Sequence, residues 1–270
     1  MCSETGIVRC SCLELLVVFL CAMAPLPARA MTEAQLTMEC PYDGVKFTFM
    51  TQMSGAVSDR TLDLKPVGMI QSPWPLAVCP SNGFVFLKEK YEPAELEKLR
   101  PLILSAEYQA LKEETPYYRA AWIEERNGAS REEVVNLLLQ ATWEAAEAET
   151  HKPVVSGTEK GEDQGGALPQ GEGGARYRRY AGELLQRLST PASGQGDARS
   201  QQQNESVLRG ELLRRLGRFE EADKEFIAVA AMLDAAKQQK LIAIVGFERR
   251  LIAQRDSGIH LQSEAKSVPQ

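Results

Sequence analysis

The stretch GELLRRLGRFEEADKEF, residues 210–226, decides the fold of the C-terminal half of the chain. It contains two helical segments, of which the first ends at Leu216, and Gly217 provides a tight turn before the second. Beyond the turn, apolar side chains recur on one helical face: Phe219, Ala222, Phe226, Val229, Ala230 and Leu233. The stretch therefore predicts an antiparallel pair of helices.

Further helices are expected on both sides of this pair. A third helix would cover the apolar surface that the pair leaves exposed, through Leu241, Ile244, Val245, Leu251 and Ile252. A shorter helix is expected from Tyr177 to Leu188. The helical region thus covers residues 176–255, and residues 256–270 are predicted to be a flexible tail.

A second helical region, residues 92–151, is predicted upstream. A helix ends there at Asn127 and Gly128, and Ser130 and Glu133 have the spacing of a capping box for the next helix. Residues 152–175 contain many glycines among acidic and polar residues. This composition is typical of a flexible linker that carries no packed structure.

Residues 31–91 are predicted to form a small β-rich unit. Apolar and polar residues alternate from Val45 to Phe49, which is the period of a strand. Two similar turns begin with a cysteine, CPYDG at residues 40–44 and CPSNG at residues 79–83, and each precedes a strand. Asp or Asn followed by Gly suits the left-handed backbone of a tight turn.

The first thirty residues resemble a secretory signal peptide. An apolar run is followed by Ala28-Arg29-Ala30, an A-x-A cleavage pattern, so we expect a mature start near Met31 in the periplasm or outside the cell. Cleavage removes four cysteines and leaves Cys40 and Cys79, which we predict to form one disulfide. No later segment is long and apolar enough for a membrane span.

The net charge of −6 argues against nucleic acid as a partner. The chain has two histidines and no phosphate-binding or zinc-protease motif, so no catalytic residue and no cofactor is predicted. Adjacent acidic pairs, such as Glu124-Glu125 and Glu132-Glu133, point apart on a helix and are interpreted as solvated faces.

The opening stretch resembles a tetratricopeptide (TPR) repeat. The resemblance rests on Gly210, Leu213, Gly217, Phe219, Ala222 and Phe226. In such repeats, small residues allow the two helices to approach closely, and stacked repeats present an extended concave surface. The resemblance implies a protein or peptide partner.

Residues 38–255 together resemble the bacterial domain-of-unknown-function 2225 family, whose members look like a zinc-ribbon segment with two C-P-x-C-G knuckles followed by TPR-like helices. In this chain Asp43 and Asn82 stand where the second cysteine of each knuckle would be. The resemblance implies that the two turns face each other, which would bring Cys40 and Cys79 within bridging range. A metal site formed by these four residues is the alternative, although asparagine is a poor zinc ligand.

We therefore predict an α+β fold that is mainly α: a disulfide-closed, ribbon-like β unit followed by TPR-like antiparallel helical hairpins. The leading functional hypothesis is an exported, non-enzymatic interaction or scaffold protein. One alternative is a residual zinc-binding module. The other is an envelope hydrolase with a carboxylate pair about 5 to 10 Å apart in a cleft.

Overall fold

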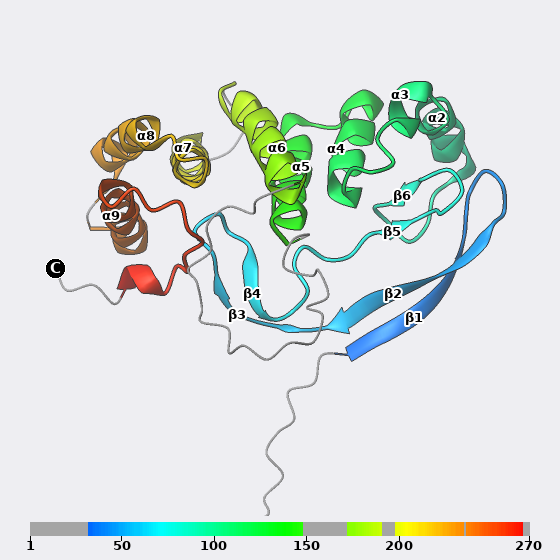
Figure 1. Cartoon of the computed structure of the whole chain (residues 1–270), viewed down its shortest axis with the longest axis horizontal. Helices are drawn as coiled ribbons and strands as arrows, with labels where there is room; N and C mark the ends of the chain where they lie inside the picture. Colours follow the sequence, from blue (N-terminus) through cyan, green and yellow to red (C-terminus); the bar gives the residue numbers. More distant parts are fainter. Residues whose placement is uncertain (1–31, 148–171, 191–197, 235, 267–270) are drawn as a thin grey trace, which may run out of the picture. The chain divides into compact units, whose positions relative to one another are not determined.

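The computed structural model describes residues 32–147, 172–190, 198–234 and 236–266 (Figure 1). The predicted signal peptide over 1–30 and residues 152–171 of the predicted linker lie outside these ranges. Within them, short antiparallel strands come first and helices follow. The predicted class, an α+β fold that is mainly α, is confirmed.

The described strands form separate two-stranded antiparallel sheets. The pairs are β1 (Thr32–Glu39) with β2 (Lys46–Ser54), β3 (Ala56–Arg60) with β4 (Pro66–Met69), and β5 (Ala77–Val78) with β6 (Val85–Phe86). A two-stranded sheet buries little apolar surface by itself. These sheets therefore depend on other parts of the chain for their stability.

Helices occupy most of the described chain after residue 92. Their bounds are α2 (Pro93–Ile103), α3 (Ala106–Gln109), α4 (Pro116–Asn127), α5 (Arg131–Glu147), α6 (Glu172–Leu188), α7 (Ala198–Arg215), α8 (Phe219–Met232), α9 (Gln239–Ala253) and the 3-10 helix η1 (Glu264–Lys266). From α4 to α9, each helix contacts the next one along the chain. Helical repeats pack in this sequential manner.

The α4–α5 hairpin follows from its sequence signals. Gly128 ends α4 with a positive φ of 94°. The predicted capping box then begins α5: the Ser130 amide donates to Glu133 Oε2 at 2.8 Å, and the Glu133 amide donates to Ser130 Oγ at 3.2 Å. The two bonds satisfy the backbone amides of Ser130 and Glu133, which have no hydrogen-bond partner within the helix.

Two apolar cores hold the described chain together. The larger one lies mainly among α4 to α9 and includes Tyr177, Tyr180 and Leu184 of α6, which are fully buried. The smaller one joins the two cysteines and Phe84 to residues of α2, α3 and α4, namely Leu99, Ile103, Tyr108 and Ile123. The β unit is therefore anchored to the helices through its cysteine turns.

Two predicted boundaries are wrong. The linker was expected to continue to residue 175, but α6 begins at Glu172. Gly173 and Gly174 are buried in this helix, and α6 packs along α5. Tertiary packing thus overrides a composition that is otherwise typical of a loop.

The second correction concerns the predicted flexible tail. Residues 256–266 return to the β unit, where Leu261 forms an antiparallel bridge with Thr61. The Leu62 amide donates to the carbonyl of His260 at 3.0 Å, and the Gln262 amide donates to the carbonyl of Arg60 at 2.8 Å. The tail therefore closes a contact between residues about two hundred positions apart, a pairing that no local pattern reveals.

Candidate functional site

The two cysteine turns have the same backbone geometry. The amides of Gly44 and Gly83 each donate to the carbonyl of the cysteine four residues earlier, at 3.0 and 2.9 Å. Both glycines have positive φ, 70° and 75°, which favours glycine at these positions. Cys40 and Cys79 are buried and form a disulfide with a Cα–Cα distance of 5.4 Å. The predicted pairing is confirmed.

Asp43 and Asn82 occupy equivalent positions in the two turns. Asp43 Oδ1 accepts a hydrogen bond from the Val45 amide at 3.2 Å, and Asn82 Oδ1 accepts one from the Phe84 amide at 2.9 Å. Asn82 Nδ2 also faces Asp43 Oδ2 at 3.4 Å. Each side chain therefore stabilises its own turn, and the pair connects the two turns.

Three of the four residues considered as alternative metal ligands lie close together. One ligand atom from each of Cys40, Asp43 and Cys79 lies within 4.8 Å of the others. Both sulfurs are bonded to each other, however, and zinc is bound by thiolates. The amide of Asn82 adds no suitable ligand. The disulfide-bonded residues do not fit a zinc ion.

The TPR-like residues lie together in the α7–α8 hairpin. Ala222 and Phe226 of α8 are fully buried, and Gly210 of α7 lies against the Phe226 ring. Gly217 makes the turn between the helices with φ 72°. Leu213 and Phe219 are buried as well. This pattern accounts for packing, and its side chains do not provide a reactive group.

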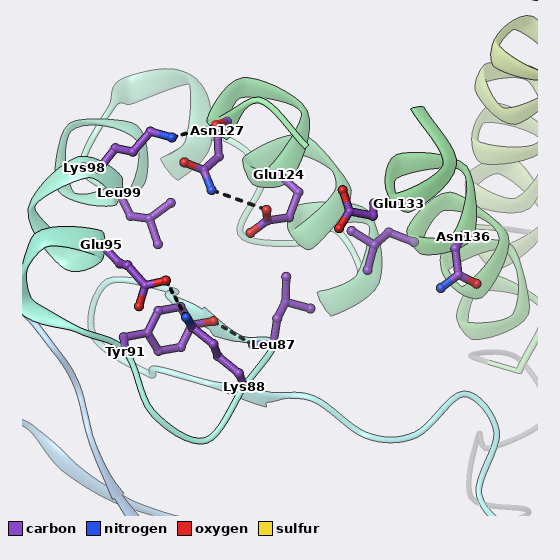
Figure 2. A pocket seen from close by; sticks show the side chains of 11 residues that line it. Leu87, Lys88, Tyr91, Glu95, Lys98, Leu99, Glu124, Asn127, Glu133 and Asn136 are labelled. Carbon is purple, nitrogen blue, oxygen red and sulfur yellow. Dashed lines mark hydrogen bonds and ion pairs between the residues drawn. The ribbon is translucent and has the colours of Figure 1, made fainter. Parts of the chain in front are cut away.

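A cleft of about 450 Å³ lies where α2, α4, α5 and the loop after β6 meet (Figure 2). Leu87, Leu99 and Leu137 give it an apolar part. Its other lining residues are polar or aromatic: Lys88, Tyr91, Glu95, Lys98, Glu124, Asn127, Glu133 and Asn136. Apolar walls with a few polar groups are typical of binding sites, and the volume is in the usual range for them.

Both lysines of the cleft already have partners within the protein. Lys88 forms an ion pair with Glu95, and its ammonium group lies 4.8 Å from the centre of the Tyr91 ring. Lys98 donates to the carbonyl of Asn127 at 2.8 Å, where α4 ends. A ligand in the cleft therefore meets few free donors from these side chains.

Two carboxylates of the cleft have pKa values that are lowered by their hydrogen-bond partners. The pKa of Glu133 is lowered by hydrogen bonds from the backbone and hydroxyl of Ser130, and the pKa of Glu95 is lowered chiefly by Lys88. Glu124 accepts a long hydrogen bond of 3.4 Å from the Asn127 amide group. Glu95 and Glu133 are therefore ionised at neutral pH.

The sequence signals did not identify this cleft. Glu124 and Glu133 were interpreted only as members of adjacent pairs on solvated faces, and Glu125 does point elsewhere, to Arg187. Glu124 and Glu133 nevertheless flank the turn at Gly128, so both reach the same end of the hairpin. The predicted turn and capping box contained this information, but the opposite wall comes from α2 and could not be placed.

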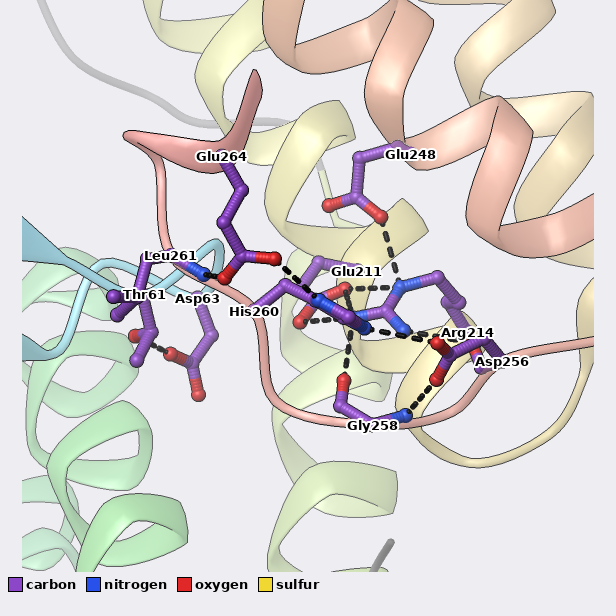
Figure 3. Close-up of polar contacts among 10 residues, drawn as sticks. All are labelled: Thr61, Asp63, Glu211, Arg214, Glu248, Asp256, Gly258, His260, Leu261 and Glu264. Atoms are coloured by element: carbon purple, nitrogen blue, oxygen red, sulfur yellow. Dashed lines mark hydrogen bonds and ion pairs between the residues drawn. The ribbon is translucent and has the colours of Figure 1, made fainter. Parts of the chain in front are cut away.

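A second polar cluster is centred on Arg214, Glu211 and Glu248, whose side chains are buried (Figure 3). Arg214 is fully buried and donates from Nε to Glu211 at 2.8 Å and to Glu248 at 2.9 Å. Its other nitrogens donate to the carbonyls of Asp256 at 2.7 Å and Gly258 at 3.0 Å. Burial and the neighbouring Glu211 raise the pKa of Glu248 well above its usual range. The cluster ties α7 and α9 to the returning tail.

In the described part of the chain, no helix combines the length and the apolar character needed to cross a membrane. The chain matches no protein-family model, and comparisons with characterised proteins and with solved structures give no match either.

Proposed function

We propose that the protein is an exported, non-enzymatic interaction scaffold that binds a segment of a partner protein in the cleft between α2, α4 and α5. The cleft itself carries the proposal, because it combines three leucines with polar groups at one opening. Peptide segments are recognised by such combinations of apolar contact and a few oriented polar groups. The TPR-like hairpin α7–α8 continues the same series of helices.

Export is part of this proposal. The Cys40–Cys79 disulfide supports it because disulfides persist mainly in oxidising compartments such as the periplasm or the extracellular medium. The signal-like pattern of residues 1–30 points the same way. A distant relationship to the domain-of-unknown-function 2225 family is supported by the matched geometry of the two cysteine turns.

The hydrolase alternative required an acidic pair in a cleft, and the cleft does contain several glutamates. Acid–base hydrolysis also needs a carboxyl group that keeps its proton near neutral pH. Glu95 and Glu133 have lowered pKa values and accept hydrogen bonds at helix starts. The glutamates with raised pKa, namely Glu144 on α5 and the two around Arg214, do not line this cleft. The cleft therefore favours binding over catalysis.

A blocked cleft provides the test. Asn136 is exposed on α5 at the edge of the cleft, so Asn136→Trp places a large side chain over the opening without disturbing a core. Asn204→Trp, at an exposed position of α7, is the matched control. We expect the wild type and the control to bind pools of short random peptides in fluorescence anisotropy, and the blocked variant to lose this binding. Equal binding by the blocked variant, or no binding by the wild type, contradicts the proposal.

A further inference from the structure

The cleft offers a ligand more acceptors than donors. Glu124 and Glu133 form no ion pair within the described part of the chain, although both line the cleft. The side-chain oxygen of Asn127, a third lining residue, is buried and receives no hydrogen bond there. Since the cleft lysines are already engaged, a ligand that supplies several hydrogen-bond donors and a positive charge would complement this lining.

The two carboxylates come from adjacent helix ends. Glu124 lies in the last turn of α4 and Glu133 in the first turn of α5, and both extend into the same opening (Figure 2). The opening is therefore suited to a positively charged group that can contact two carboxylates together.

Arginine fits these groups better than lysine does. Its planar guanidinium has five donors in a fixed arrangement and forms paired hydrogen bonds with carboxylates, whereas the lysine ammonium is a compact point charge. The aliphatic part of an arginine side chain can also pack on Leu87, Leu99 and Leu137. The volume of about 450 Å³ leaves space for a neighbouring residue of the same segment.

We infer that the partner segment presents an arginine side chain whose guanidinium binds between Glu124 and Glu133. This inference rests on the proposed peptide-binding function of the same cleft. The net charge of −6 on the protein would also draw a basic segment toward it. The partner is thus a protein with an exposed, extended, arginine-containing segment flanked by apolar residues.

The experiment compares three labelled pools of short peptides that differ only at the central position, which is arginine, lysine or citrulline. Citrulline has nearly the shape of arginine but carries no charge. We expect the arginine pool to bind the wild-type protein about tenfold more tightly than the citrulline pool, as is usual for the loss of a charge-assisted pair. Lysine should be intermediate.

Variants then locate the arginine. The double variant Glu124→Gln with Glu133→Gln should weaken binding of the arginine pool about tenfold and leave the citrulline pool unchanged. Glutamine at 133 can keep the capping box, so the helix start is preserved. Glu97→Gln removes an exposed charge on α2 outside the cleft and serves as the control, which should bind like the wild type.

The outcomes separate the inference from the function on which it rests. Equal binding of the arginine and citrulline pools overturns the inference while the cleft remains a peptide site. A clear loss of arginine binding in the Glu97→Gln control, which removes one charge where the double variant removes two, shows that only net charge matters, and this also overturns it. Failure of the wild type to bind any pool overturns the inference together with the proposed function.

Discussion

Gly210 on α7 lies so close to Phe226 on α8 that a Cβ at position 210 would come within 2.6 Å of the ring. The ring itself is fully buried, so it has little space to move. This contact sets the distance between the two helices of the TPR-like hairpin. It explains why a glycine occupies the middle of a helix, where it is otherwise unfavourable.

Gly210→Ala should therefore destabilise the protein. The gain in helix propensity is about 1 kcal/mol, but overpacking against an immobile ring costs about 1 to 3 kcal/mol, so we expect a net loss in the free energy of unfolding. Gly182→Ala is the matched control, because position 182 of α6 is exposed and has open space around it. Urea denaturation should show that the control is slightly stabilised. A stabilised Gly210→Ala variant would mean that the hairpin can open without cost.

Glu144 on α5 makes the stability depend on pH. Burial raises its pKa to about 7 from an ordinary value of 4.5, although it accepts a hydrogen bond from the Tyr117 amide at 2.9 Å. Between these pH values the folded protein holds a proton that the unfolded chain releases. The associated stability is fully present below the unfolded pKa and is lost as the pH rises through the folded pKa.

Glu144→Gln removes this titration and keeps an oxygen that can accept the Tyr117 hydrogen bond. Relative to the wild type, the variant should gain about 3 kcal/mol at about pH 8 and little at about pH 4. Denaturation curves across this range provide the measurement, with Glu97→Gln as an exposed control whose difference from the wild type should stay small. A Glu144→Gln variant with the same pH dependence as the wild type contradicts the assignment.

The disulfide should contribute strongly to stability. Its cysteines are 39 positions apart, and closing a loop of this length stabilises by about 4 kcal/mol in the chain-entropy model. Reduction of the wild type should lower the free energy of unfolding by a similar amount. The double variant Cys40→Ala with Cys79→Ala should already be destabilised and should not respond to reductant. An identical response of the two proteins to reductant would exclude a stabilising disulfide.

The sequence predicted features that depend on nearby residues or on simple counting. The disulfide followed from the number of cysteines after the proposed signal, and the turn at Gly217 followed from helical spacing. The predicted end of the linker at residue 175 is wrong, because the glycines at 173 and 174 are typical of a linker. Only the packing of α6 on α5 shows that they belong to a helix. The local pattern could not show that the helix was supported from outside.

Features that join distant segments could not be predicted. The cleft requires α2 beside the α4–α5 hairpin, and the tail requires Thr61 beside Leu261. Arg214 is the clearest case, because charged residues of a helix ordinarily lie on a solvated face. Its burial results from α9 and the tail, which supply Glu248 and two carbonyl groups.

Arg214→Met tests whether this buried cluster holds the tail. The substitution leaves Glu211 and Glu248 without their cation and two tail carbonyls without a donor, so we expect a loss of about 3 to 5 kcal/mol. Arg218→Met removes an exposed ion pair with Glu221 and should cost less than about 1 kcal/mol.

The direction of the pH effect makes the test specific to charge. Without Arg214, Arg215 is the buried cation that remains beside Glu211, so burial favours a proton on at least one of the two glutamates and the loss should grow as the pH rises. Adding Glu211→Gln and Glu248→Gln to Arg214→Met should remove this growth and recover part of the stability, although the tail carbonyls still lack their donor. Limited proteolysis should therefore cut the tail in both variants but not in Arg218→Met. A tail that stays protected after Arg214→Met would show that the Thr61–Leu261 bridge holds it without the cluster.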